Sequence, residues 1–350
     1  MTINSPVYAS REDVKRAADF KETARSNDRV DRALESASRS VEGLTHRTFY
    51  PETATRYFDW PDRNRSMSWR LWLHADELVS ATTVTAGGTT ISASDFFLEP
   101  ANSGPPYNRV EIDLESNAAF ASDQTHQRAI EIAGVWGHDN ETAQVATLAE
   151  ALDSSETGVD VDDSSGIGVG SLLLVGSERM LVTDVANLDT GQNTGAGLTS
   201  QANDVTVTVT TGSDYHVGEV ITVDSESMLI VGITGNDLTV KRAWDGSVLA
   251  AHSSGADIYA PRTLTVQRGA LGSTAASASL SDPVSVQLYP GPVRDLTIAE
   301  ALSQLHQESA GYARVVGTGD NVMESAGRGL RILRDDVFRK YGRKLRMRAV

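Results

Sequence analysis

A group of acidic side chains, Asp160, Asp162 and Asp163, precedes a Ser-Ser-Gly turn and could offer oxygen ligands to a divalent cation. A calcium-hand loop also needs glycine at its sixth position and glutamate at its twelfth. Counted from Asp160, these positions hold Ser165 and Ser171. The spacing therefore favours an acidic turn after a strand, which Asp, Ser and Gly form readily, and we expect no metal site.

Other residues that could carry chemistry lack the spacing that it requires. The run GIGVG, residues 166–170, lies in strand-like sequence and not at a helix start, so it does not match a dinucleotide fingerprint. The histidines show no HExxH or paired spacing, and no phosphate loop or G-x-S-x-G elbow occurs. Asp245, Ser247 and His252 could form a triad only if the fold brought them together, and a turn hydrogen bond from His252 is favoured. We expect no enzyme activity and no cofactor.

Three tryptophans, Trp60, Trp69 and Trp72, lie close together in the sequence. They could form a sugar-binding platform or a subunit contact. Packing in a core or an interface is favoured, because aromatic residues dominate both.

The C-terminal segment is the basic part of an acidic chain. Residues 328–350 hold nine Lys or Arg and two Asp, a net +7, whereas the whole chain carries −16, so the remainder carries −23. Its apolar residues fall on one helical stripe ringed by positive charge, which favours docking on an acidic protein surface over DNA binding or a solvated face. The docking residues that this pattern predicts are Arg328, Leu330, Arg331, Leu333, Arg334, Val337, Arg339, Lys340, Tyr341, Arg343 and Lys344.

Length and composition indicate a globular chain with room for two or three domains. The 350 residues are 40% hydrophobic and 22% charged. The chain has no cysteine, no apolar run long enough to cross a bilayer and no secretory signal, so we expect synthesis in a cytoplasm and no membrane partner. Its acidic body repels nucleic acid as a class.

Helical periodicity occurs at both ends of the chain. We expect a helix from Ser10 to about Lys21, with Ser10 and Asp13 as its capping box. A turn at residues 26–28 and a second helix that ends near Gly43 should follow. After a break at residues 290–292, a capping box at Thr297 and Glu300 predicts a helix to Tyr312, and a last helix follows. The helices at residues 29–44 and 297–312 should pack together, because each has one apolar stripe to bury.

Between these helices the sequence changes to strand patterns. Short strands are expected between Thr53 and Val135, with a hairpin at Gly87-Gly88. Residues 147–289 alternate Val with Thr and Ser, which is typical of half-buried strands. Residues 189–203 are rich in Gly, Thr, Asn and Gln, and we expect a loop there.

The β-rich region contains two sequence repeats in an unusual order. Residues 159–185 match 207–233 without a gap, and residues 238–247 match 264–273. The order of first half, first half, second half, second half predicts that an inner module, at about 205–260, interrupts an outer module, at about 147–188 plus 263–289. Strand 263–268 should then pair within the outer module and strand 238–242 within the inner one, since neither first half has its own closing strand.

The flanks of this region resemble the head–tail connector proteins (adaptor or head-completion proteins) of tailed phages. The resemblance begins at Arg29. In that family an amphipathic helix ends in a phrase that Glu42, Thr45, Arg47, Phe49 and Pro51 fill here, and the similar segment TRYFDWPD, residues 55–62, follows. The later AIEIAGVWGH, residues 129–138, is similar to a strand of the same family, and the inserted modules resemble β modules of phage structural proteins.

This resemblance implies an α+β fold and a structural function. The implied division is a connector core at 1–142, an inserted β domain at 143–290 that is dispensable for the connector fold, and C-terminal helices with a basic tail at 291–350. The protein would form a homo-oligomeric, dodecameric ring in the virion neck, between the portal protein and a tail-side connector or tail terminator protein. DNA would pass through its lumen without specific binding. The alternative is a virion β-module binding protein, an adhesin or capsid decoration.

Overall fold

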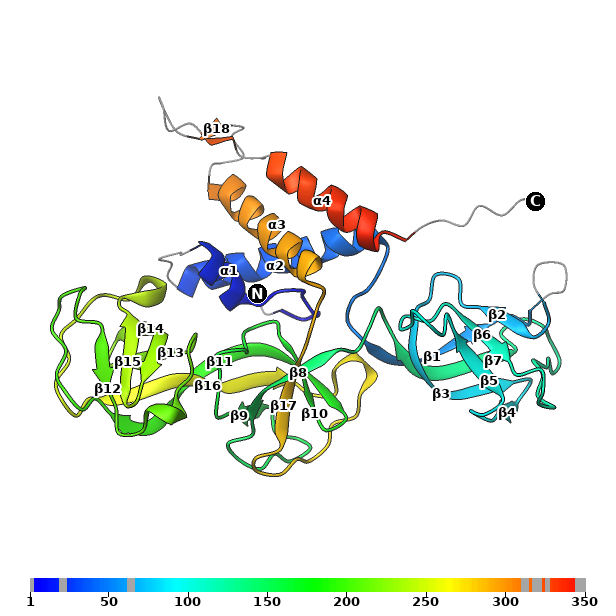
Figure 1. The fold of residues 1–350 in the computed structure, drawn as a ribbon, viewed down its shortest axis with the longest axis horizontal. Helices are drawn as coiled ribbons and strands as arrows, with labels where there is room; N and C mark the ends of the chain where they lie inside the picture. Colours follow the sequence, from blue (N-terminus) through cyan, green and yellow to red (C-terminus); the bar gives the residue numbers. More distant parts are fainter. Residues whose placement is uncertain are drawn as a thin grey trace. The chain divides into compact units, whose positions relative to one another are not determined.

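The computed structural model describes residues 3–18, 24–61, 67–309, 315–316, 323–324 and 328–343 (Figure 1). These residues combine helices with antiparallel sheets, which confirms the α+β fold class. By contacts they form two compact units: unit 1 comprises the described parts of 1–46, 142–270 and 274–350, and unit 2 comprises those of 47–141 and 271–273. The predicted domain boundaries, which separate helices from β modules, stay predictions.

Four helices form the helical layer of unit 1: α1 (Arg11–Ala18), α2 (Ala24–Thr45), α3 (Gly291–Ser309) and α4 (Arg328–Tyr341). The capping box of α1 is present: the backbone N–H of Asp13 donates to Ser10 Oγ, and that of Ser10 donates to Asp13 Oδ2. None of the helices in the described ranges is long and apolar enough to cross a membrane.

Two helix boundaries differ from those predicted. The turn expected at 26–28 is wrong, because α2 begins at Ala24 and continues past Gly43 to Thr45, with His46 in the left-handed region at φ 54°. The cap expected at Thr297 is also wrong, because α3 begins at Gly291. Proline is well tolerated in the first turn of a helix, so Pro292 lies in the first turn of α3 instead of blocking the helix. The Thr297 hydroxyl donates to the carbonyl of Val293 one turn earlier, inside the helix.

The predicted packing of α2 on α3 is confirmed. Leu34 of α2 and Ala301 of α3 are fully buried. At the end of α3, Glu308 accepts from Arg32 of α2, with an Nη2–Oε2 distance of 2.9 Å. Two helices separated by more than two hundred residues in the sequence therefore share one core.

Unit 2 is built from two small sheets over one core that includes Leu73, Val84, Ile132 and Trp136. The first sheet has the order β1-β7-β3-β4 and the second β2-β6-β5, all antiparallel. The predicted hairpin at Gly87-Gly88 joins β3 to β4. The strands are β1 (Glu52–Phe58), β2 (Arg70–Trp72), β3 (Leu78–Ala86), β4 (Thr89–Ile91), β5 (Phe96–Glu99), β6 (Arg109–Ile112) and β7 (Ile130–Trp136).

The β modules of unit 1 share one sheet with the order β12-β15-β14-β13-β16-β11-β10-β17-β8, and β9 pairs with β16 off this path (Figure 1). Its strands are β8 (Thr142–Thr147), β9 (Gly158–Asp160), β10 (Leu172–Val175), β11 (Glu178–Asn193), β12 (Thr206–Thr208), β13 (Val220–Val223), β14 (Glu226–Thr234), β15 (Asp237–Lys241), β16 (Asp257–Gln267) and β17 (Pro283–Gln287). Short 3-10 turns are η1 (Gly212–Asp214), η2 (Trp244–Gly246) and η3 (Ala270–Gly272). A two-stranded pair, β18 (Val315–Val316) and β19 (Met323–Glu324), completes the described elements.

The strand pairing predicted from the repeats is confirmed. The end of β16 pairs with the outer module, at Thr263↔Asp160 on β9 and Val266↔Val182 on β11. Strand β15 pairs with β14 inside the inner module, for example at Ile230↔Val240. The start of β16 also pairs with β13 of the inner module, at Val223↔Ile258, so one strand closes both modules.

The loop predicted at 189–203 is partly wrong, because β11 runs on to Asn193. Its second half pairs with β16, at Asp189↔Tyr259, and so reaches from the outer module to the inner one. These polar residues form a strand because β16 lies beside them and supplies the hydrogen-bond partners of a β ladder. The local composition alone does not indicate a strand.

The β modules are not a free appendage of the helical layer. A Cβ added to Gly170 of the outer module would lie 2.4 Å from Val7 Cγ2, and Ile3 and Val7 are both almost fully buried. The backbone N–H of Arg11 donates to the Val169 carbonyl at 3.0 Å. The expectation that the insertion is dispensable therefore lacks a structural basis, since its removal would expose apolar side chains of the N-terminal segment.

Candidate functional site

The predicted docking helix α4 uses part of its apolar stripe inside unit 1. It packs on α3 and α2, with Val337 fully buried and Leu330, Leu333 and Tyr341 half-buried. These side chains therefore contribute to the helical layer of their own chain. The side chain of Arg328 and the whole of Lys344 lie outside the described residues.

The basic residues of α4 divide into two groups. Arg334 donates from Nε to Glu300 Oε1 of α3 at 2.6 Å, and the backbone N–H of Arg343 donates to the Thr45 carbonyl, so both hold the helix to its layer. Arg331, Arg339 and Lys340 are exposed. Two apolar residues beside them, Ile332 and Phe338, were not among the predicted docking residues, and their side chains are about half exposed. Both lie off the apolar stripe of α4, and this position in the sequence could have indicated their exposure.

The residues that carry the family resemblance support the local fold. Glu42 Oε1 accepts from the Tyr8 hydroxyl at 2.7 Å, and the Thr45 hydroxyl donates to the Val41 carbonyl. In unit 2, Arg47 pairs with Glu77 at 3.1 Å, and the fully buried Phe49 meets the His138 ring edge to face. The His138 ring accepts from Arg47 at Nδ1, and burial, aided by this cation, lowers the pKa of His138 to about 4.

The tryptophans take packing roles. Trp60 and Trp69 pack on the core of unit 2, and Trp60 Nε1 donates to the Phe120 carbonyl at 2.7 Å. The Trp72 ring is covered by the guanidinium of Arg109 at 5.3 Å. The interpretation as packing residues accounts for these contacts.

The acidic turn at 160–163 is committed to its own backbone and neighbours. Asp160 accepts from the Thr263 hydroxyl, Asp162 from both the amide and the hydroxyl of Thr147, and Asp163 from the Ser165 amide. Asp163 also lies near His216 and Glu219, with one ligand atom of each within 4.8 Å of the others. Both oxygens of Glu219 already accept from Arg262, at 2.7 and 2.9 Å. This group therefore joins the outer module to the inner one.

The strongest chemical signature of the modules is a buried Arg–Glu clasp that occurs in each. In the inner module Arg242 donates from Nε and Nη2 to Glu226, which also accepts from the amides of Ala243 and Ala250. In the outer module Arg268 and Glu178 repeat this set, with the amides of Gly269 and Ala276. The signal was present in the sequence, because Glu178/Glu226 and Arg242/Arg268 are charged positions retained in both repeats.

Burial and hydrogen bonding act in opposite directions on the pKa of Glu226 in the inner clasp. Burial alone raises the pKa of Glu226, but the Arg242 guanidinium, the two amides and His252 outweigh it and lower that pKa to about 2. The His252 ring is wholly buried and lies between Asp224, 2.7 Å from Nδ1, and Glu226, 3.0 Å from Nε2. Asp245 instead pairs with Lys15, and the Ser247 hydroxyl donates to the Trp244 carbonyl, so no triad forms.

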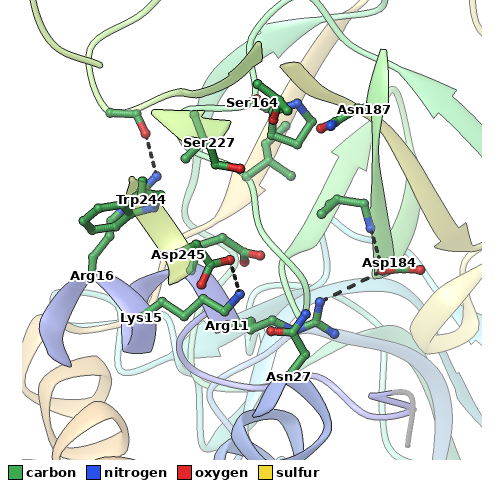
Figure 2. A pocket seen from close by; sticks show the side chains of 17 residues that line it. Arg11, Lys15, Arg16, Asn27, Ser164, Asp184, Asn187, Ser227, Trp244 and Asp245 are labelled. Carbon is green, nitrogen blue, oxygen red and sulfur yellow. Dashed lines mark hydrogen bonds and ion pairs between the residues drawn. The ribbon is translucent and has the colours of Figure 1, made fainter. Parts of the chain in front are cut away.

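A pocket of about 240 Å³ lies between helix α1 and the two modules, and we call it the α1 pocket (Figure 2). Arg11, Lys15 and Arg16 of α1 line one wall. Ser164 and Asp184 of the outer module and Ser227, Trp244 and Asp245 of the inner module line the others, with Asn27 of α2 at the edge. In Figure 2, Lys15 reaches Asp245 and Arg11 reaches Asp184 across this space, at 2.6 and 4.0 Å.

No family model, curated protein sequence or solved structure matches this chain.

Proposed function

We propose that this chain is a structural head–tail adaptor of a tailed-phage virion. It would form a homo-oligomeric ring in the neck, between the portal protein and a tail-side connector or tail terminator protein, and DNA would pass through the ring without specific binding. It would catalyse nothing.

One observation carries the proposal. The segments that resemble connector proteins, residues 29–62 and 129–138, meet as the neighbouring strands β1 and β7, which pair over seven residues from Glu52↔Trp136 to Phe58↔Ile130. Strand β1 follows α2 directly in the sequence, so the family-like helix and both family-like strands make one continuous structural path. Two segments that carry the resemblance therefore pair with each other directly, from Thr55↔Ala133 to Phe58↔Ile130.

The exposed face of α4 offers the contact to the portal. Arg331, Arg339 and Lys340 are free of α2 and α3, although Arg339 pairs with the exposed Asp336 of α4 itself at 2.6 Å. Ile332 and Phe338 add apolar surface beside them. Positive charge steers association with an acidic partner, while apolar side chains bury area once the contact forms. Arg334 is excluded from this set because Glu300 already holds it.

Co-elution with the portal protein of the same phage tests this contact. The wild-type chain should co-elute with the portal, and Arg331→Glu combined with Arg339→Glu and Lys340→Glu should abolish co-elution while leaving the circular dichroism spectrum unchanged. Arg128→Glu, an exposed arginine of unit 2, is the control and should co-elute normally. Unchanged portal binding by the triple variant would contradict the assigned face, and tight binding of duplex DNA at physiological salt would contradict the adaptor role.

A virion β-module binding protein remains the alternative. The feature that favours it is the α1 pocket, to which the β modules contribute most of the lining residues. Labelling of intact particles discriminates between the two, because an antibody to an adaptor binds only at the neck, whereas one to a decoration or adhesin binds over the capsid or at the fibres.

A further inference from the structure

The two β modules have equivalent faces, and only the face of the outer module is fully covered. Leu172 and Leu181 of the outer module match Val220 and Leu229 of the inner module in the gapless repeat. Both leucines are 1% exposed, yet neither belongs to the core of the outer module, because they point to the other side of its sheet. The inner pair lies outside its module's core in the same way but is only half-buried.

The N-terminal segment covers this face of the outer module. The fully buried Val169 accepts at its carbonyl from the Arg11 amide at 3.0 Å, and its own amide donates to Glu12 Oε2 at 2.8 Å. Next to it, a Cβ added to Gly170 would lie 2.4 Å from Val7 Cγ2. Backbone hydrogen bonds and apolar contacts together attach the segment to the outer module.

The matching positions of the inner module are open. Val217, which matches Val169, is 59% exposed. Among the described parts of the chain, neither its amide nor its carbonyl has a hydrogen-bond partner. A Cβ built on the following Gly218 would meet no heavy atom within 4 Å. The inner module therefore repeats the surface that receives the N-terminal segment on the outer module, but leaves it without a cover.

The backbone around this surface is the same in both modules. The Gly218 amide donates to the Ile230 carbonyl at 2.8 Å, as the Gly170 amide does to the Val182 carbonyl. Val231, which follows Ile230, is 51% exposed. Four residues thus form an apolar surface that we call the inner-module patch: Val217, Val220, Leu229 and Val231.

The composition of the inner-module patch indicates that it is covered by protein. The solvated face of an antiparallel sheet is normally polar. Here every position of the patch is apolar, and Val231 stands where the outer module has Thr183. Contiguous exposed apolar residues on a soluble protein mark interaction sites. The open face of the inner module is therefore at least as apolar as the covered face of the outer one.

The patch continues the contact between α1 and the modules. Arg16 of α1 donates from Nη2 to the Gly218 carbonyl at 2.8 Å, and Val220 lines the α1 pocket together with Arg16. Helix α1 therefore reaches the edge of the patch and stops short of Val217 and Val231. An occupant would pack beside α1 and extend an interface that already exists within the chain.

We propose that the inner-module patch is the surface through which each subunit holds a neighbouring copy of this chain in the ring. This inference rests on the proposed function, because a ring places a second copy against every subunit. The contacts of a ring join two different surfaces of the same chain, so the patch does not have to fit itself. It shares no residue with the exposed face of α4, so portal docking and subunit contact can occur together.

Mass photometry of the full-length chain, alone and with the portal protein, measures ring assembly. Val217→Arg combined with Val231→Arg should reduce the fraction of chain in rings by about tenfold or more, because it places two charges in the contact. Both positions are exposed, so the circular dichroism spectrum should stay that of the wild type. Leu280→Arg, at an exposed apolar position of the outer module, is the control and should assemble normally.

A photo-crosslinking amino acid at position 231 identifies the occupant directly. In assembled rings it should join two copies of the chain, and mass spectrometry of the linked peptides should then locate the facing surface. A crosslink to the portal alone, or no crosslink between copies, would overturn the proposal. This readout needs no charged substitution, so it decides the question even if the double arginine variant fails to fold.

Failure of this proposal differs from failure of the adaptor role. Normal rings from the folded double arginine variant, or equal loss of rings in the Leu280→Arg control, would contradict the patch and leave the adaptor role intact. Absence of rings from the wild-type chain, with and without the portal, would contradict the adaptor role and this inference together.

Discussion

Arg242 and Glu226 face each other as a two-point ion pair inside the inner module, with both N–O distances at 2.7 Å and side chains that are 2% and 0% exposed. Arg268 and Glu178 hold the same relation in the outer module. Each arginine directly follows a strand of its module's second half, β15 or β16, and each glutamate begins a strand of its first half. The clasp therefore ties the second half of each module to its first half, and in the outer module it does so across the interruption.

Glu226→Ala should lower the free energy of unfolding by ~3–5 kcal/mol, because it leaves the buried Arg242 charge without its carboxylate partner. Urea unfolding followed by circular dichroism measures this change. Asp336→Ala is the control: it removes an exposed i,i+3 partner of Arg339 and should cost less than ~1 kcal/mol. Equal effects of the two variants would contradict a structural role for the clasp.

Removal of both partners of the clasp should be milder than removal of one. Glu226→Ala combined with Arg242→Met removes both charges of the clasp, so its free energy of unfolding should recover part of the loss seen for Glu226→Ala alone. A double-mutant cycle in urea tests this. Strict additivity of the two single changes would mean that Arg242 and Glu226 do not act as a pair.

Unit 2 should lose stability as the pH falls from about 6.5 to about 4. The folded pKa of His138 is depressed from 6.5 to about 4, because burial and Arg47 disfavour the charged ring. The unfolded chain therefore binds a proton first, and the contribution is complete above the unfolded pKa and lost through this window. The full effect is on the order of 2–3 kcal/mol. Urea unfolding at pH 7, 5.5 and 4 should show this slope, and His138→Gln should flatten it.

The clasp of the inner module should respond in a lower pH window. The pKa of Glu226 falls from 4.5 to about 2 on folding, so its stabilising contribution is complete above about 4.5 and lost as the pH approaches 2. As the pH falls, protonation of His138 should therefore destabilise unit 2 first, and the inner module should lose its structure only at a lower pH. A Trp244 fluorescence change that is complete by pH 5 would contradict this order.

Leu34→Asp should lower the free energy of unfolding by several kcal/mol, because it places a charge in the core that α2 shares with α3. Ser36→Asp, an exposed position on the same helix, should change the melting temperature little. Calorimetry on both variants measures the difference. A shared core is contradicted if the two melting temperatures agree.

Replacement of residues 147–289 by a short Gly/Ser linker should yield aggregated protein. Ile3 and Val7 would lose the outer-module surface that buries them, including the backbone at Gly170. Sedimentation of the expressed variant measures solubility. A soluble, helical product would show that the helical layer folds without the modules.

The arrangement of the modules could be predicted from the sequence because the repeats retain both their apolar alternation and their turn glycines. Gly170 and Gly218, for example, match in the alignment and both adopt a left-handed φ, of 94° and 93°. The cap at Ser10 and Asp13 was predictable because it is local. The start of α2 and the polar half of β11 were not, because tertiary partners decide them against local propensity.

The candidate sites, too, were predictable only where they depend on local sequence. The basic stripe of α4 was visible as periodicity, but the exposed anchors Ile332 and Phe338 depend on which face α3 covers. The α1 pocket brings Arg11, Lys15, Arg16 and Asn27 together with Ser164, Asp184 and Asp245, and nothing in the local sequence indicates that proximity. Only the contact between α1 and the modules creates it.

Imaging of the purified chain by negative-stain electron microscopy tests the adaptor proposal most directly. The proposal predicts closed rings with a central opening wide enough for duplex DNA, formed by the wild-type chain alone or on addition of the portal protein. Monodisperse monomers under both conditions, with no ring at any protein concentration, would contradict it.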